Sequence, residues 1–204
     1  VGEQSGPNNE GVRLARGRYV AFLNHDDLWL PQHLEETLNA LDDTGADMVF
    51  TLSITIDARQ RERLAGVTSA GRYERGCFAP ASSWVCRREL FDEVGPWRPA
   101  SSLYVAPSTD WIERVHRSGK VVLALPVVTV VAILSGGRKN SYSERQVDEH
   151  ARTIGRLRSD PHFVASLITS AALGAARDQQ QVGALMVTAL RNGASALMSS
   201  MGVH

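Results

Sequence analysis

The chain has 204 residues, of which 43% are hydrophobic and 22% are charged, an ordinary composition for a globular protein that can bury a sizeable core. Lys plus Arg and Asp plus Glu each number 22, so the formal net charge is zero. This balance gives no electrostatic reason to expect nucleic acid or an anionic membrane as the main partner.

Compartment and membrane signals are few. No segment offers the roughly 20 uninterrupted apolar residues that a transmembrane helix needs, and residues 1–10 lack the apolar run of a signal peptide. Cys77 and Cys86 show neither metal-ligand spacing nor a CxxC pattern, which favours two free thiols over a disulfide. We expect a cytoplasmic protein, with peripheral contact at the inner face of a membrane left open. The Arg, Ala and Gly bias indicates a GC-rich, bacterial genome.

The first quarter of the chain alternates helix and strand signals. Residues 10–16 are expected to form a helix capped by Asn8 or Asn9. The run Tyr19 to Leu23 is short and apolar, which is typical of a strand buried on both faces. Pro31 is expected to open a helix over 32–41. The next strand is expected over 47–56.

The rest of the chain continues the pattern and ends in helices. The expected elements are a loop or hairpin over 57–80, a strand over 84–86, helices over 87–94 and 109–117, and a strand over 121–134 broken at Pro126. Ser108 is expected to cap the helix over 109–117. Residues from 144 onward are expected to be helical, with a break at 159–161. Strands interspersed with helices predict an α/β sheet, here assigned to a domain over 1–143, followed by a helical extension over 144–204.

Four polar residues, Asn24 to Asp27, follow directly after the first buried strand. Ligands bind at the carboxyl ends of strands in open α/β sheets. Hard divalent cations take one or two carboxylates together with substrate phosphates. The turn is therefore a candidate metal and nucleotide site. The alternative is a solvated turn in which Asp26 or Asp27 caps the next helix.

The stretch from Asn9 to Pro31 resembles the core of the family 2 glycosyltransferases, which have the GT-A fold. In that family a helix ending in Ala-x-Gly leads into an apolar strand, a DxD-type metal motif, an aromatic residue and a Pro. The resemblance implies a partial GT-A mixed sheet flanked by helices. It places Asn24 at the first acid of the motif, as a donor-binding residue. It makes Asp26 the ligand of Mg²⁺ or Mn²⁺ and a donor-binding residue, with Asp27 as a second ligand or a supporting residue.

The same resemblance implies a catalytic base. An acidic pair followed by an aromatic residue carries the base in similar enzymes, and its second acid aligns with Asp110, while Thr109 replaces the first. Glu113 would be the fallback. The alternative for Asp110 is a first-turn acid that only complements the helix dipole.

Two further features complete the expected site. Trp84 and Trp97 lie in a segment that resembles the acceptor side of the family, although a large indole is more often part of a core. The loop over 135–142 carries Arg138 and Lys139 beside glycines, which suits a clamp on the donor diphosphate, or simply a solvated basic loop.

The resemblance therefore implies an inverting, metal-dependent transfer of a sugar from a nucleotide-diphospho-sugar to an acceptor, either a saccharide or a lipid-linked one. It covers about residues 7–145, and a complete domain of the family would begin well upstream, with its nucleoside-binding strands. A remnant that only binds sugar or partners is the alternative. A phosphotransferase ranks third, because the chain has no GxxxxGK[ST] loop.

Overall fold

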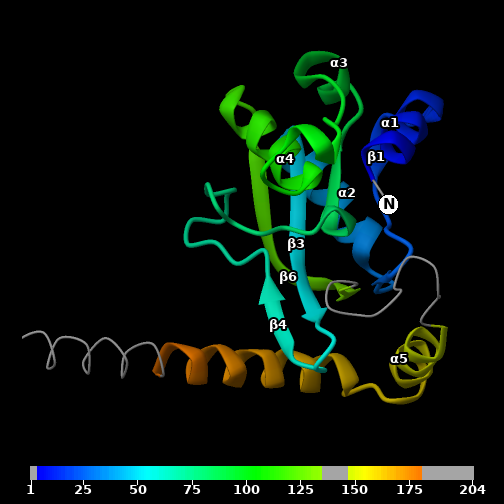
Figure 1. The fold of residues 1–204 in the computed structure, drawn as a ribbon, viewed down its shortest axis with the longest axis vertical. Coiled ribbons are helices and arrows are strands. Elements are labelled where there is room, and N and C mark those ends of the chain that lie inside the picture. Colours follow the sequence, from blue (N-terminus) through cyan, green and yellow to red (C-terminus); the bar gives the residue numbers. More distant parts are fainter. Residues whose placement is uncertain (1–3, 135–146, 181–204) are drawn as a thin grey trace, which may run out of the picture.

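The computed structural model describes residues 4–134 and 147–180. Its centre is a six-stranded mixed sheet in the order β1-β5-β3-β6-β2, with β4 paired to β3 beside this path (Figure 1). The strands are β1 (Tyr19–Ala21), β2 (Asp27–Trp29), β3 (Met48–Ile56), β4 (Glu62–Ala65), β5 (Trp84–Arg87) and β6 (Val122–Ile133). The pair β3 and β6 is parallel, and the other pairs are antiparallel.

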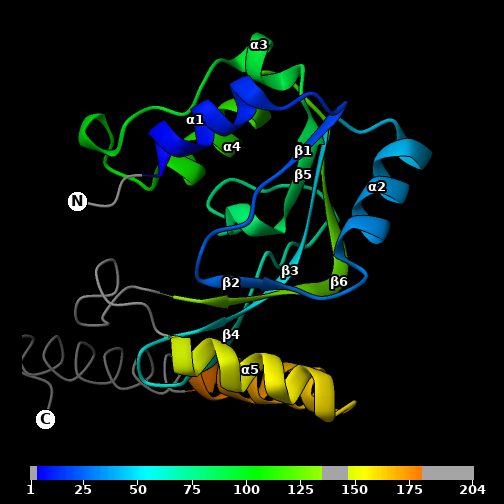
Figure 2. The ribbon, with the colours of Figure 1, turned by 90° about the vertical axis from the view of Figure 1, so that its right-hand side faces the viewer.

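Helices cover both faces of this sheet. They are α1 (Ser5–Leu14), α2 (His33–Thr44), α3 (Leu90–Val94), α4 (Pro107–Arg117) and α5 (Val147–Ser159), and residues 163–180 are also helical. Figure 2 shows α2 on one face, α1 and α4 on the other, and α5 below the sheet. No helix of the described ranges combines the length and apolarity needed to cross a bilayer.

Side chains on the two faces of β3 pack into two separate hydrophobic cores, because side chains alternate along a strand. Met48 and Phe50 point into the larger core with Trp84, Trp97 and the helix α4. Val49, on the opposite face, packs under α2. Trp84 and Trp97 are at most 2% exposed and stack with other rings of this core, so they are packing residues rather than a sugar platform.

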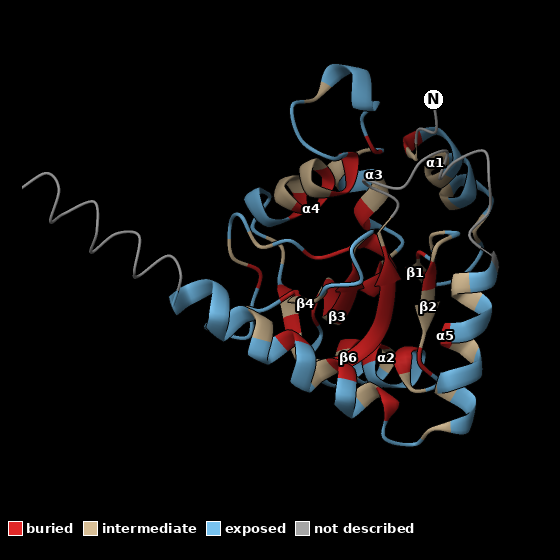
Figure 3. Ribbon diagram, turned by 60° about the horizontal axis from the view of Figure 1, so that its bottom comes forward, coloured by how far each residue is buried: buried red, intermediate tan, exposed pale blue. Residues whose placement is uncertain are grey.

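The far end of β3 and β6 is covered by the C-terminal helices. Ile54 and Ile56 pack against Phe163 and Leu167, and α5 turns its exposed face outward (Figure 3). The expected helical extension is thus present as far as residue 180, with its break after α5. The proposed domain boundary at 143/144 lies outside the described residues.

Pro126 disturbs β6 without ending it. Thr51 pairs with Leu125 and Leu52 with Val128, so Pro126 and the residue after it bulge out of the ladder. A proline has no N–H to donate, and a bulge accommodates it within a strand. The predicted break is therefore a register shift in one continuous strand.

Three sequence expectations were wrong in detail. The first helix begins at Ser5, and Asn9 bonds the backbone of Trp97 instead of capping. The helix α4 begins at Pro107, since a proline suits the first helical position, and Ser108 therefore lies inside it rather than at its cap. Strand β2 was missed, because three residues containing an acid give no strand signal.

Candidate active site

A cavity of about 560 Å³ lies at the carboxyl ends of β1 and β6. Five segments line it: the start of α1, the turn over 23–27, residues 78–81 before β5, the approach to α4, and the end of β6. The acidic turn predicted from the sequence is thus part of a cavity wall. This is the edge at which open α/β sheets bind their ligands.

Asp26 faces this cavity with few protein contacts. Its side chain is 17% exposed, and its carboxylate lies 3.7 Å from the Nδ1 atom of His25. Its carbonyl accepts a hydrogen bond from the amide of Ile133, at the end of β6. The backbone of Asp26 is therefore fixed to the sheet while the carboxylate remains available to a ligand.

Asp27 is held by the protein instead. Its Oδ2 atom accepts hydrogen bonds from Ser82 Oγ at 2.5 Å and from Asn24 Nδ2 at 3.0 Å. Ser82 Oγ also accepts the backbone N–H of Asn24 at 3.0 Å. The side chain of Ser82 therefore joins both ends of the acidic turn to the segment before β5.

Burial shapes the electrostatics of the turn. Asp27 is only 8% exposed, and this burial, followed by the neighbouring charge of Asp26, raises the pKa of Asp27 to about 6, although the hydrogen bonds from Ser82 and Asn24 oppose the shift. The pair therefore combines a carboxylate open to the cavity with one that the protein holds in a dry, hydrogen-bonded position.

The turn fits a divalent cation only in part. Among the described residues no group of three His, Cys, Asp or Glu side chains could hold a metal ion. Mg²⁺ is often bound through a single carboxylate and completed by water and substrate phosphates, an arrangement that Asp26 suits. Asp27 would have to give up its contact with Ser82 or Asn24 before both of its oxygens could serve as ligands.

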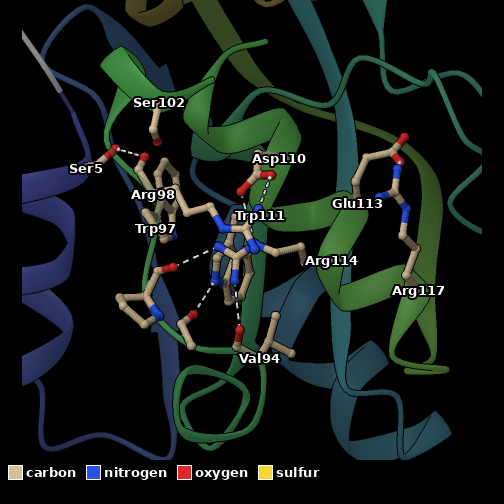
Figure 4. A network of polar contacts seen from close by, with 12 residues as sticks. Ser5, Val94, Trp97, Arg98, Ser102, Asp110, Trp111, Glu113, Arg114 and Arg117 are labelled. Carbon is tan, nitrogen blue, oxygen red and sulfur yellow. Dashed lines mark hydrogen bonds and ion pairs between the residues drawn. The ribbon is translucent and has the colours of Figure 1, made fainter. Parts of the chain in front are cut away.

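The structure places Asp110 in a network of ion pairs (Figure 4). Arg114 Nε donates to Asp110 Oδ2 at 2.9 Å, and Arg98 Nη1 lies 3.5 Å from Asp110 Oδ1. Arg114 also donates to the carbonyls of Val94 and Pro96, both at 2.7 Å. The cavity lining includes two residues at the start of α4 but not Asp110.

The predicted site residues are thus only partly assembled. Asn24, Asp26 and Asp27 share the cavity wall, while Asp110 lies further along α4. Arg138 and Lys139 lie outside the described residues. The sequence did not indicate Ser82, because a single serine among small residues forms no recognisable motif. The four residues of Pro, Ala and Ser before Trp84 indicate only a tight turn at this position.

Residues 4–95 match the family model of glycosyl transferase family 2. The matched segment, 92 of the 204 residues, is similar to this family. An uncharacterized glycosyltransferase of Nostoc sp. (strain PCC 7120), alr2836, is 32% identical over 108 residues, which are 47% of this chain and 34% of that protein. The chain thus matches about a third of the length of this relative.

One solved structure shows a similar fold. TarS of S. aureus, residues 1–349 in complex with UDP-GlcNAc, superimposes with a TM-score of 0.50 and 14% identity over 75% of this chain and 45% of that one. Another crystal structure of the same TarS fragment gives a TM-score of 0.49, over 65% and 40% of the two chains. The mixed sheet with its flanking helices is a partial GT-A-like fold followed by helices, as the sequence predicted. At this identity the likeness concerns the fold alone.

Proposed function

We propose that this family 2 segment belongs to an enzyme that transfers a sugar from a nucleotide-diphospho-sugar to an acceptor hydroxyl, with inversion at the anomeric carbon. The observation that carries the proposal is the carboxylate of Asp26, open to a cavity at the carboxyl ends of β1 and β6. The family match, together with the UDP-GlcNAc of the TarS complex, supports a nucleotide-sugar as donor.

Three residues of the turn, Asn24, Asp26 and Asp27, have separate tasks in this proposal. Asp26 holds Mg²⁺ or Mn²⁺, and Asn24, which lines the same cavity, accepts a hydrogen bond from a donor hydroxyl. The cation, when bound, neutralises the charge that develops on the departing diphosphate. Asp27 supports the turn through Ser82. Arg138 and Lys139 are the candidate clamp on the diphosphate.

Asp110 is the proposed catalytic base. Its Oδ2 atom is held by Arg114, whereas Oδ1 has the longer 3.5 Å contact with Arg98, whose side chain is 58% exposed. In this proposal Oδ1 takes the proton from the acceptor hydroxyl after Arg98 has moved away. The acceptor is a saccharide or a lipid-linked sugar, which a cytoplasmic protein meets at the inner face of the membrane.

The first test is calorimetric binding of UDP, GDP and dTDP with and without Mn²⁺. Wild-type protein is expected to bind one of them only with the metal, and Asp26→Asn to weaken that binding by more than about 100-fold, beyond the typical effect of losing a group that supports a metal ligand. Asp43→Asn, at an exposed position on α2, is the matched control and should bind as wild type does. Metal-independent binding, or equal binding by both variants, would remove the proposed site.

A binding module without catalysis is the second candidate. The observation that favours it is the ion-paired state of Asp110, which gives this carboxylate a structural role. Donor turnover separates the two functions: Asp110→Asn should slow transfer by about 10²- to 10⁴-fold if Asp110 is a base. Metal-dependent nucleotide binding with no turnover of any nucleotide-sugar would favour the module.

A further inference from the structure

The metal-binding candidate Asp26 directly precedes a very short edge strand. Among the described strands, β2 pairs with β6 alone, through three residue pairs (Figure 2). Three residues make few ladder hydrogen bonds, so the backbone alone anchors this strand weakly. Side-chain contacts must therefore contribute to the position of β2 and of the residue before it.

Trp29, the last residue of β2, supplies such a contact. Its indole Nε1–H donates to the carbonyl of Ser82 at 2.7 Å. The side chain of the same Ser82 bonds Asp27, the first residue of β2. Both ends of the strand are thus attached to one residue of the segment before β5, and the turn over 24–27 is attached there as well.

The imidazole of His33, the first residue of α2, packs against the face of the Trp29 indole. The two rings stack with centroids 4.6 Å apart and an angle of 27° between their planes. His33 is 1% exposed, and its Nδ1 atom lies 2.7 Å from Thr129 Oγ1, which in turn lies 2.6 Å from Thr51 Oγ1. These contacts connect the imidazole to β6 and β3, the two central strands.

Only one of the two ring nitrogens of His33 has a polar partner in the described part of the chain. Its Nε2 atom is buried and has no hydrogen-bond partner in the described part of the chain. Burying a polar atom without a partner is unfavourable. The contact that fixes the plane of the ring is therefore the one to Thr129, and this orientation is the one that presents the ring face to Trp29.

We propose that His33 is a positioning residue for the acidic turn: its ring, oriented by Thr129, holds the Trp29 indole against Ser82 and so fixes β2 and Asp26 at the cavity wall. The consequence for ligand binding rests on the proposed function, whereas the consequence for the turn itself does not. His33 acts from α2, outside the cavity lining.

The test is amide hydrogen exchange of the ligand-free protein with two substitutions. His33→Asn removes the ring but keeps a polar atom that can reach Thr129, and His33→Phe keeps the ring without that atom. We expect His33→Asn to accelerate exchange of the Asn24 and Ile133 amides, which bond Ser82 and Asp26, by about three- to tenfold, the range of an aromatic pair contact. His33→Phe should accelerate this exchange less than His33→Asn does, because the stack on Trp29 remains and only the contact that orients the ring is lost.

Controls separate positioning from general destabilisation. The amides of β3 at Val49 and Phe50 report global opening, so the acceleration at the turn must exceed theirs. Thr55→Val removes another buried hydroxyl of β3, one that bonds Arg63 and does not take part in the His33 contacts. Equal acceleration at the turn and in β3, or none at the turn, would overturn the proposal.

Nucleotide binding provides the functional measurement. Affinity for Mn²⁺-UDP should fall about three- to tenfold in His33→Asn and stay unchanged in Thr55→Val. Absence of nucleotide binding by wild-type protein would count against the proposed function, while the exchange data would still decide the role of His33. Unchanged exchange at the turn overturns that role even when nucleotide binding is intact.

Discussion

The acidic turn and the α4 network each contain aspartates predicted from the same family resemblance, and their side chains are similarly exposed, yet their carboxylates have different partners. Asp26 faces a cavity and contacts one partly exposed histidine. Asp110 is enclosed by two guanidinium groups, one of which also bonds two backbone carbonyls (Figure 4). A carboxylate that is already neutralised contributes mainly to stability, whereas one left open to a cavity can bind a cation.

The same contrast is repeated within the turn itself. Asp26 and Asp27 are neighbours, but only Asp27 is buried and bonded to Ser82 and Asn24. The local reason is the contacts of the two carboxylates: Asp27, the first residue of β2, is bonded by Ser82 and Asn24, whereas Asp26 lies in the turn before the strand. Both aspartates line the cavity, so they differ in their partners and not in the side they face.

The largest effect on stability is expected in the α4 network. Arg114→Met should lower the free energy of unfolding by about 3 kcal/mol, because it leaves a mostly buried Asp110 without its main partner and two carbonyls without a donor. Arg117→Met, one turn along the same helix, is the control: its side chain is 61% exposed and pairs with Glu113, so its loss should cost less than about 1 kcal/mol. Urea unfolding of both variants measures the difference. Equal losses would show that the network is no more than a surface ion pair.

The sequence was sufficient to locate those helices and strands that are determined by residues close together in the chain. The strand expected over 47–56 and the helix expected over 109–117 were located within two residues, because the spacing of apolar residues acts over a few positions. The acidic turn follows β1 and lies in a cavity wall, but β1 is an edge strand with one buried residue and not the strand buried on both faces that the sequence predicted.

Contacts between distant segments were beyond the sequence. The partner of β2 is β6, about a hundred positions away along the chain, and Ser82 reaches Asp27 from a different loop. The pairing of Asp110 with Arg98 likewise depends on how the loop that carries Arg98 packs against α4, so a motif alone could not tell a free base from an ion-paired one. The spacing of residue types in the sequence indicates which side chains are candidate site residues. Their hydrogen-bond and ion-pair partners in the fold decide whether each carboxylate is free or paired.

A pH effect of similar size is expected from His33, which stacks on Trp29 from the start of α2. Burial lowers the pKa of His33 from 6.5 to about 4, so the folded state binds fewer protons than the unfolded state between these values. Stability from neutral His33 is therefore complete above about pH 6.5 and is lost as the pH falls towards 4, by about 3 kcal/mol in total.

The difference in unfolding free energy between wild type and His33→Phe measures this contribution, because effects common to both proteins cancel. Asp27 is the main common effect: its raised pKa stabilises the fold at low pH, and this stabilisation is lost as the pH rises towards 6. The difference should grow with pH from about 4 to 6.5. A difference that stays constant over this range would mean that the imidazole is not desolvated in the folded state.

The smallest effect on stability is expected at Asp26. Asp26→Asn should change the free energy of unfolding by less than about 0.5 kcal/mol, because the carboxylate accepts no close hydrogen bond within the described residues and only the 3.7 Å contact with His25 is lost. Removing the negative charge beside Asp27 even relieves part of the repulsion that raises the pKa of that residue. Thermal and urea unfolding without metal are the measurement. A loss above about 1 kcal/mol would show that Asp26 is held by contacts within the fold as Asp110 is, and the distinction between an open and an ion-paired carboxylate would not hold. Unchanged stability together with lost Mn²⁺-UDP binding would show the opposite: at this position the protein keeps a charge that contributes little to folding and is needed by the ligand.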